Sequence, residues 1–116
     1  MNTSNGAILA LCLSAGIASA ESSNPLVITA SYYSTGLRTA NGEPFDPDGF
    51  TAASRTLPFG TRLQVTNPAT GRSVVVRVND RGPFIRGRSL DLSRGAAAAL
   101  GMIERGVANL QVARLD

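Results

Sequence analysis

The 116-residue sequence predicts a mainly β fold, a small closed or nearly closed barrel of short strands with one short helix. Several short segments alternate apolar and polar residues or are rich in β-branched residues. Twelve Gly and six Pro interrupt them at short intervals, and only one segment has the composition of a helix. A two-sheet sandwich is the alternative, but the long irregular segment 34–50 breaks the even strand spacing that a sandwich needs.

The first half of the barrel contains three predicted strands. The segment 26–34, LVITASYYS, is rich in β-branched and aromatic residues. The segment 61–67 alternates apolar and polar side chains, and 72–78, RSVVVRV, is strongly β-branched. Between these two, Pro68 presets φ for a turn and Gly71 can adopt a positive φ, so we predict a hairpin.

The second half contains the helix and the remaining strands. SLDLS (89–93) and ANLQVARL (108–115) are predicted strands, which brings the expected total to about six. The helix is predicted at 93–101, where four consecutive alanines and a leucine favour helical structure. Ser93 is the expected N-cap, and Gly101 suits the left-handed position that follows a helix.

Residues 1–20 have the pattern of a secretory signal peptide, an apolar stretch ending in Ala-Ser-Ala, although no Lys or Arg precedes it. We expect export to the periplasm or cell envelope, a flexible lead-in at 21–27 and the barrel domain at 28–116. The apolar stretch is too short for stable membrane insertion. A lipid anchor at Cys12 is the alternative, which we do not favour because Leu11 is bulkier than the residue expected before a lipidated cysteine.

Charge and composition limit the possible partners and chemistry. The net charge is +3 and every basic residue is Arg, which suits an anionic partner such as a cell-wall polymer. No basic stripe with interleaved aromatics indicates nucleic acid. Since the sequence has no His, Ser-His-Asp and Cys-His catalysis are excluded. We expect a monomer that uses no metal and no cofactor.

Asp80 is the main candidate for acid catalysis. It follows the apolar strand at 72–78, and Gly82-Pro83 stiffens the loop after it. A general acid for glycosidic cleavage must be protonated near neutral pH, which burial against Phe84 or a second carboxylate would favour and an adjacent Arg would oppose. An ordinary turn aspartate that bonds its own backbone is an equally weighted interpretation.

The other acids have simpler interpretations. Glu43, Asp46 and Asp48 lie in the irregular segment 39–50, where a solvated loop explains each of them, although two converging carboxylates would form an acid/base pair. Asp91 alternates with leucines just before the helix, so we expect it to cap the helix or to lie in the core as a polar residue.

Three further side chains are candidates for binding a sugar. Tyr32 and Tyr33 point to opposite faces of their strand, so one should lie in the core while the other offers a flat ring to a sugar. Arg81 follows Asp80 directly and is expected to hold a carboxylate or acetamido group of a ligand.

Together these residues carry a resemblance to a known family. The blocks ASYYS, RTANGEPFD, TAASRTLPFGTRLQVTN, GRSVVVRVNDRGPF and RSLDLSRGAAAALGM follow one another as in the rare lipoprotein A family, from about residue 28 to 115. The resemblance implies a six-stranded double-psi β-barrel. It also implies an endolytic lytic transglycosylase that acts on peptidoglycan glycan strands stripped of stem peptides and leaves 1,6-anhydro-N-acetylmuramic acid ends.

The resemblance also implies a site. The family's Glu and Asp fall on Glu43 and Asp80, the expected catalytic pair, and its His falls on Ser54, which cannot accept a proton at neutral pH. Tyr33 matches the family's tyrosine and Tyr32 replaces its usual Trp; we expect Ser54 and both tyrosines to contact the substrate. Because of Ser54, a non-catalytic glycan-binding barrel is the alternative function.

Overall fold

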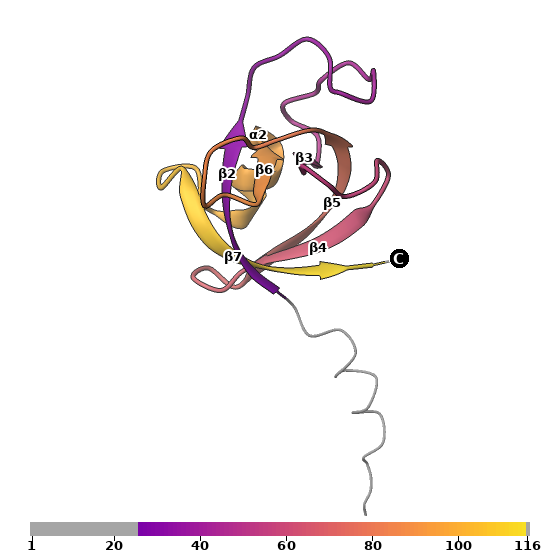
Figure 1. Ribbon diagram of the computed structural model, residues 1–116. Coiled ribbons are helices and arrows are strands. Elements are labelled where there is room, and N and C mark those ends of the chain that lie inside the picture. The colour runs from indigo at the N-terminus through magenta and orange to yellow at the C-terminus, as the bar shows by residue number, and fades with distance from the viewer. Residues whose placement is uncertain (1–25, 116) are drawn as a thin grey trace, which may run out of the picture.

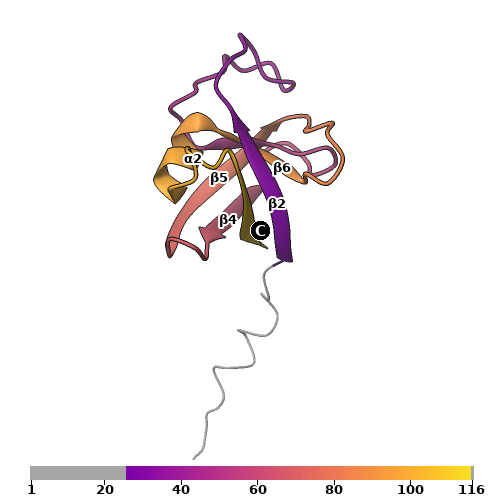
Figure 2. The same ribbon diagram turned by 90° about the vertical axis from the view of Figure 1, so that its left-hand side faces the viewer.

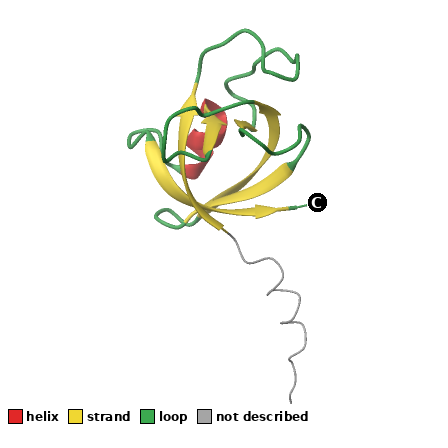
Figure 3. Ribbon diagram, in the orientation of Figure 1, coloured by secondary structure: helices red, strands yellow, loops and turns green. Residues whose placement is uncertain are grey.

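The computed structural model describes residues 26–115. The predicted signal peptide, Cys12 and most of the predicted lead-in lie outside these residues. Six strands close into a barrel in the order β2-β6-β3-β5-β4-β7, with one helix packed against it (Figure 1, Figure 3). The elements are β2 (Leu26–Tyr33), β3 (Thr51–Ala53), β4 (Arg62–Asn67), β5 (Arg72–Asp80), β6 (Leu90–Ser93), α2 (Arg94–Leu100) and β7 (Val107–Arg114). The predicted fold class is confirmed.

The barrel interior is aliphatic, as expected from a sequence without Trp. Inward side chains recur at every second position, for example Leu63 and Val65 in β4 and Val76 and Val78 in β5, all at most 2% exposed. Full burial of one such side chain contributes roughly 1.5–3 kcal/mol. The helix adds its own buried face, made of Ala96, Ala97 and Leu100.

Most element predictions are confirmed, and two details differ. The strand predicted from Leu26 is β2, the 61–78 hairpin forms between β4 and β5, and Gly101 ends the helix with a φ of 74°. However, β3 was not predicted, and β5 continues to Asp80. Within the described residues, no helix is long and apolar enough to span a membrane.

Ser93 lies at the N-cap position of α2, as predicted, with extended backbone angles. Its hydroxyl makes no capping hydrogen bond to the helix. It donates to the Gly49 carbonyl (2.6 Å) and accepts from the Thr51 N–H (3.1 Å). Ser93 therefore connects the start of the helix to the start of β3, a long-range role that a local capping pattern does not reveal.

A register shift on β5 decides which side chains the outer face of the sheet carries. Ala52 lies opposite Val78, but Ala53 lies opposite Asp80, so Asn79 is an extra residue in the pairing. Strict alternation would place Asp80 on the inner face with Val78, whereas the shift pairs it with outward Ala53. A β-bulge thus turns Asp80 to the outside of the barrel.

The irregular segment 34–50 rises above one end of the barrel and returns to β3 (Figures 1 and 2). Several hydrogen bonds attach it to the barrel and the helix, two of them between backbone groups at its middle. The Asn41 N–H donates to the Asn79 carbonyl (3.2 Å), and the Gly95 N–H of the helix donates to the Pro47 carbonyl (2.7 Å). These contacts place the segment next to the end of β5, where the candidate site lies.

Candidate functional site

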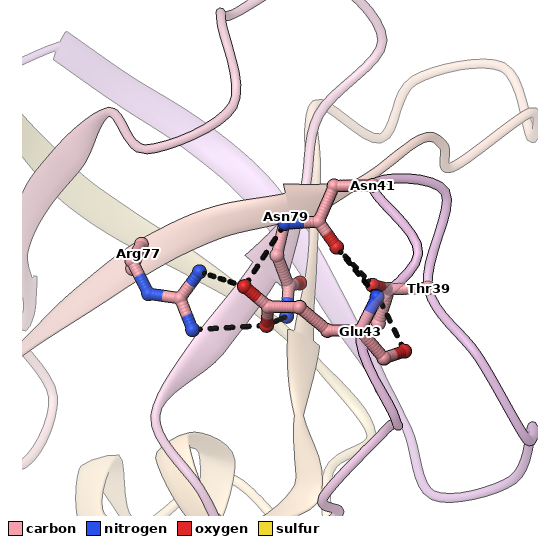
Figure 4. A network of polar contacts seen from close by, with 5 residues as sticks. All are labelled: Thr39, Asn41, Glu43, Arg77 and Asn79. Atoms are coloured by element: carbon pink, nitrogen blue, oxygen red, sulfur yellow. Dashed lines mark hydrogen bonds and ion pairs between the residues drawn. The ribbon is translucent and has the colours of Figure 1, made fainter.

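Glu43 is held by a network of side chains from β5 and its own loop (Figure 4). Arg77 donates to both carboxylate oxygens (2.7 and 3.0 Å), and the side-chain amides of Asn79 and Asn41 each donate once (3.0 Å). Arg77 first, then Asn79 and Asn41, lower the pKa of Glu43 to about 2. Glu43 is therefore a fixed anion rather than a group that exchanges protons near neutral pH.

The loop around Glu43 is fixed by its own backbone. The Thr39 N–H donates to the Glu43 carbonyl (2.9 Å), and the Gly42 N–H donates to the Thr39 carbonyl (3.0 Å). Gly42 has a φ of 94°, a conformation that favours glycine. The Glu43 network thus fastens this turn to β5, and with it the backbone that reaches Asp80.

Asp80 accepts three hydrogen bonds, two of which come from distant segments. The Tyr33 hydroxyl donates to Oδ2 (2.8 Å), while the N–H groups of Ala40 (2.8 Å) and Arg81 (2.9 Å) donate to Oδ1. Asp80 thus bonds the backbone of its own turn, as one of the two interpretations expected, and it also accepts hydrogen bonds from two segments distant in sequence. Phe84, expected as a possible cover, is 81% exposed.

Asp91 lies on the same outer face as Asp80. The pairing of β6 places Asp91 opposite Ala53 and opposite Ser31, and Ala53 in turn lies opposite Asp80. The Ser31 hydroxyl donates to Asp91 (2.9 Å). The prediction that Asp91 caps the helix or lies in the core is wrong, because its strand neighbours turn it outward.

The surroundings of Asp91 favour its protonated form. Half-burial raises its pKa, and the nearby charge of Asp80 adds to that effect. The Ser31 hydrogen bond and the charge of Arg88 act in the opposite direction without cancelling it. The site therefore contains two neighbouring carboxyl groups, and the pKa of one of them, Asp91, is raised above its ordinary value.

Tyr33 connects Asp80 to the 34–50 segment. Burial, followed by the hydrogen bond to Asp80, raises the pKa of Tyr33, so its hydroxyl stays protonated and donates. Its ring stacks on Phe45, with 4.7 Å between ring centroids and 9° between planes. One face of the ring is thus already covered by the 34–50 segment.

The structure does not bring Tyr32 and Ser54 into this polar cluster. Tyr32 packs on the core, and its hydroxyl donates to the Ile103 carbonyl (3.0 Å). Ser54 is 4% exposed, and its hydroxyl accepts from the N–H groups of Thr56 (3.3 Å) and Leu57 (3.1 Å). Its backbone alone reaches β5, through a hydrogen bond from the Ser54 N–H to the Asp80 carbonyl (3.1 Å).

The guanidinium of Arg81 contacts other groups of the protein. Nη1 donates to the carbonyls of Leu57 (2.9 Å) and Ser54 (3.1 Å), and the guanidinium lies 3.9 Å from the centre of the Phe59 ring. Its contribution to Asp80 comes from its backbone N–H. Within residues 26–115 there is no group of three potential metal ligands.

The sequence did not predict that Asp91 belongs to the site, nor which side chains hold Glu43. Arg77 lies 34 residues from Glu43, and Asp91 reaches the site through its pairing with β2 and β3. The alternation in Leu-Asp-Leu indicated that Asp91 and its neighbours face opposite sides. It did not indicate which side is the outside of the barrel, and only the pairing of the strands does so.

Comparisons with known proteins agree with this architecture. The family model described as "Lytic transglycolase" matches residues 27–112. A Nostoc sp. protein named "Probable endolytic peptidoglycan transglycosylase RlpA" is 64% identical over 77 residues, which is 66% of this chain and 21% of that protein. The Pseudomonas aeruginosa "Endolytic peptidoglycan transglycosylase RlpA" is 51% identical over 94 residues, 78% of this chain and 28% of that protein. The chain thus spans less than a third of the length of these two relatives.

Two solved structures share the barrel. The "Streptomyces papain inhibitor (SPI)" has a TM-score of 0.66 at 24% identity, over 79% of this chain and 94% of that chain. An expansin from Clavibacter michiganensis has a TM-score of 0.66 at 26% identity, over 79% of this chain and 50% of that chain. The same barrel therefore occurs in proteins with different names and roles, so function must be argued from the site.

Proposed function

The chain belongs to the lytic transglycolase family of double-psi β-barrels, and on that premise we propose that it is an endolytic peptidoglycan transglycosylase. It would cut glycan strands between N-acetylmuramic acid and N-acetylglucosamine and leave 1,6-anhydro ends. The relatives that carry this activity in their names support the proposal. The observation that carries it is the pair of neighbouring carboxyl groups, Asp80 and Asp91, on one outer face of the barrel.

The geometry favours a division of roles within this pair. Asp91, whose pKa is raised, donates its proton to the glycosidic oxygen as the C1–O bond breaks. Asp80, whose oxygens are acceptors in all three of its hydrogen bonds, takes the proton of the C6 hydroxyl as that oxygen attacks C1. No water is consumed, and one proton transfer between the carboxyl groups, through solvent, restores the starting state.

Glu43 and Tyr33 position these groups rather than exchange protons. Glu43 holds the turn that supplies the Ala40 N–H to Asp80. Tyr33 fixes the rotamer of Asp80 through Oδ2. We therefore assign Glu43, which the sequence suggested as a catalytic partner, to the support of the site.

The substrate defines where the protein acts. We propose that it works in the cell envelope, after export to the periplasm, on peptidoglycan strands and as a monomer. Preference for strands without stem peptides belongs to the same proposal. The positive net charge favours association with a polymer whose free carboxyl groups are negative.

Analysis of reaction products tests the proposal directly. Incubation with purified denuded glycan should produce shorter strands with anhydro ends, identified by mass. Asp80→Asn and Asp91→Asn should each lower the rate of their formation by about 10²–10⁴, the range for one acid-base contribution. Retention of the wild-type protein on glycan without new ends would contradict the proposed activity.

A further inference from the structure

The loop 81–89 joins the two carboxyl groups of the site. It leaves β5 directly after Asp80 and enters β6 directly before Leu90 and Asp91. At its tip Phe84 is 81% exposed and Ile85 is 56% exposed. Large exposed apolar side chains in a cluster commonly mark a binding surface.

The loop is held in one shape. Arg55 Nη1 donates to the Pro83 carbonyl (2.8 Å) and to the Arg88 carbonyl (2.6 Å), so one guanidinium fastens both ends of the tip. The Arg88 N–H also donates to the Ile85 carbonyl (3.2 Å). A tip fixed in this way binds a ligand without a large cost of ordering.

The tip borders a hollow of about 390 Å³, lined by Arg55, Phe84, Ile85, Arg86 and Gly87. Arg86 is exposed, and within the described part of the chain its side chain makes no hydrogen bond or ion pair. Its guanidinium is therefore available to a ligand. By contrast, Arg55, Arg77 and Arg81 are engaged with protein groups.

We propose that this hollow is a subsite for the free lactyl carboxylate of an N-acetylmuramic acid unit, with Arg86 binding the carboxylate and the Phe84 ring lying against the sugar. The proposal rests on the proposed function and deepens it. A guanidinium fork matches a carboxylate through two parallel hydrogen bonds. A flat apolar ring matches the C–H face of a pyranose.

The subsite would give the protein a chemical means of selecting its substrate. In a strand without stem peptides each lactyl group ends in a carboxylate. In a substituted strand the same carbon is an amide, which has no charge and cannot accept a bidentate pair from Arg. The loop that carries the subsite is joined at its two ends to the strands that carry Asp80 and Asp91.

Binding measurements with two matched glycans test the proposal. Denuded strands are compared with the same strands after conversion of their lactyl carboxylates to methylamides. All proteins are the full chain in an Asp80→Asn background, so that strands stay uncut during titration. The test variants are Arg86→Gln, Phe84→Ala and Phe84→Leu, and Arg105→Gln is the charge-matched control from the turn between α2 and β7.

Arg86→Gln should weaken binding of the carboxylate strands about three- to tenfold and leave binding of the methylamide strands unchanged. Arg105→Gln should change neither. Phe84→Ala should weaken both forms, and Phe84→Leu should recover only part of the loss. An equal loss on both strands for Arg86→Gln, no loss at all, or the same loss for Arg105→Gln would overturn the carboxylate subsite. Unchanged binding of Phe84→Ala would overturn the stacking contact.

These outcomes are separable from the failure of the proposed function. If the protein forms anhydro ends but its binding does not depend on Arg86, the proposed subsite is disproved and the proposed activity stands. If binding depends on the carboxylate but the protein that retains Asp80 forms no anhydro ends, the proposed activity is disproved and the subsite stands.

Discussion

Three acidic side chains in the site region have different neighbours, and for two of them, Glu43 and Asp91, these neighbours shift the pKa in opposite directions. Glu43 is surrounded by donors, with Arg77 on both oxygens. Asp91 is half-buried beside another carboxylate. Asp80 is held by one hydroxyl and two backbone amides. The identity of the residues does not predict these roles, because all three are ordinary carboxylic acids.

The Glu43 network predicts a specific acid dependence of stability. The folded pKa of Glu43 is about 2 against an ordinary value of 4.5, so its ionised form stabilises the fold at pH values above 4.5, and this contribution is lost as the pH falls toward 2. Glu43→Gln should therefore be less stable than wild type at pH 7. The gap between their urea midpoints should shrink between pH 4.5 and 2. A gap that stays constant over this range would contradict the role of the charge.

The raised pKa of Asp91 predicts the opposite dependence of stability on pH. A raised folded pKa means that the protonated form stabilises the fold, and that this contribution is present below the ordinary value of 3.8 and lost as the pH rises through the folded pKa. Asp91→Asn cannot ionise, so its urea midpoint should exceed that of wild type at pH 7 and match it near pH 3. The same variant should lose the proposed transglycosylase activity at pH 7. Lower stability at pH 7 would show that the ionised side chain is needed for the fold.

At the scale of the elements, the helix and the 34–50 segment are joined through a contact that only glycine permits. A Cβ added to Gly95 would lie 2.5 Å from the carbonyl oxygen of Asp48. The neighbouring atoms are backbone, so they cannot move aside as a flexible side chain would. The packing of α2 thus fixes the segment that leads into β3.

Gly95→Ala separates local propensity from packing. Propensity alone predicts that alanine stabilises a helix by about 1 kcal/mol relative to glycine. The contact with Asp48 predicts a loss of about 1–3 kcal/mol instead, the cost of overpacking. Urea unfolding of the two proteins decides the sign. Ala98→Gly, at an exposed position of the same helix, provides the control for propensity without the contact.

The elements that sequence reasoning identified are those whose pattern is local. The alternation in β4, the valines of β5 and the Pro68–Gly71 turn determine the hairpin without help from the rest of the chain. β3 has three residues, Thr-Ala-Ala, which are too few to show a period. It exists because β5 and β6 lie on either side of it. Likewise, the bulge at Asn79 and the true partners of Ser93 depend on strands far away in sequence.

At the scale of the whole molecule, the barrel is closed by β7, which pairs with β2 on one side and β4 on the other. The described strands therefore form one closed sheet around a single core, and we expect them to unfold together. The number and length of the predicted strands, together with the resemblance to a double-psi family, predicted this architecture. The order of the strands was not predicted, because it depends on pairings between residues as far as 86 positions apart, such as Leu26 and Val112.

Leu110→Ala tests the cooperativity of this closure. Leu110 is fully buried in β7, so its truncation should cost about 2–5 kcal/mol. That is a large part of the roughly 5–15 kcal/mol by which a domain is stable. Unfolding followed by circular dichroism and by tyrosine fluorescence should shift together to lower urea. Two separated transitions would show that the strands do not unfold as one unit.

The extra residue at Asn79 makes the length of β5 as important as its composition. A substitution at Asn79 removes one side-chain contact to Glu43. An insertion between Val78 and Asp80 would instead turn Asp80 away from its hydrogen-bond donors Tyr33 and Ala40, or it would add a second bulge to the strand. Single-codon insertions and deletions at this point should therefore be far more damaging than missense changes, and a library scanned for both would locate the bulge from phenotype alone.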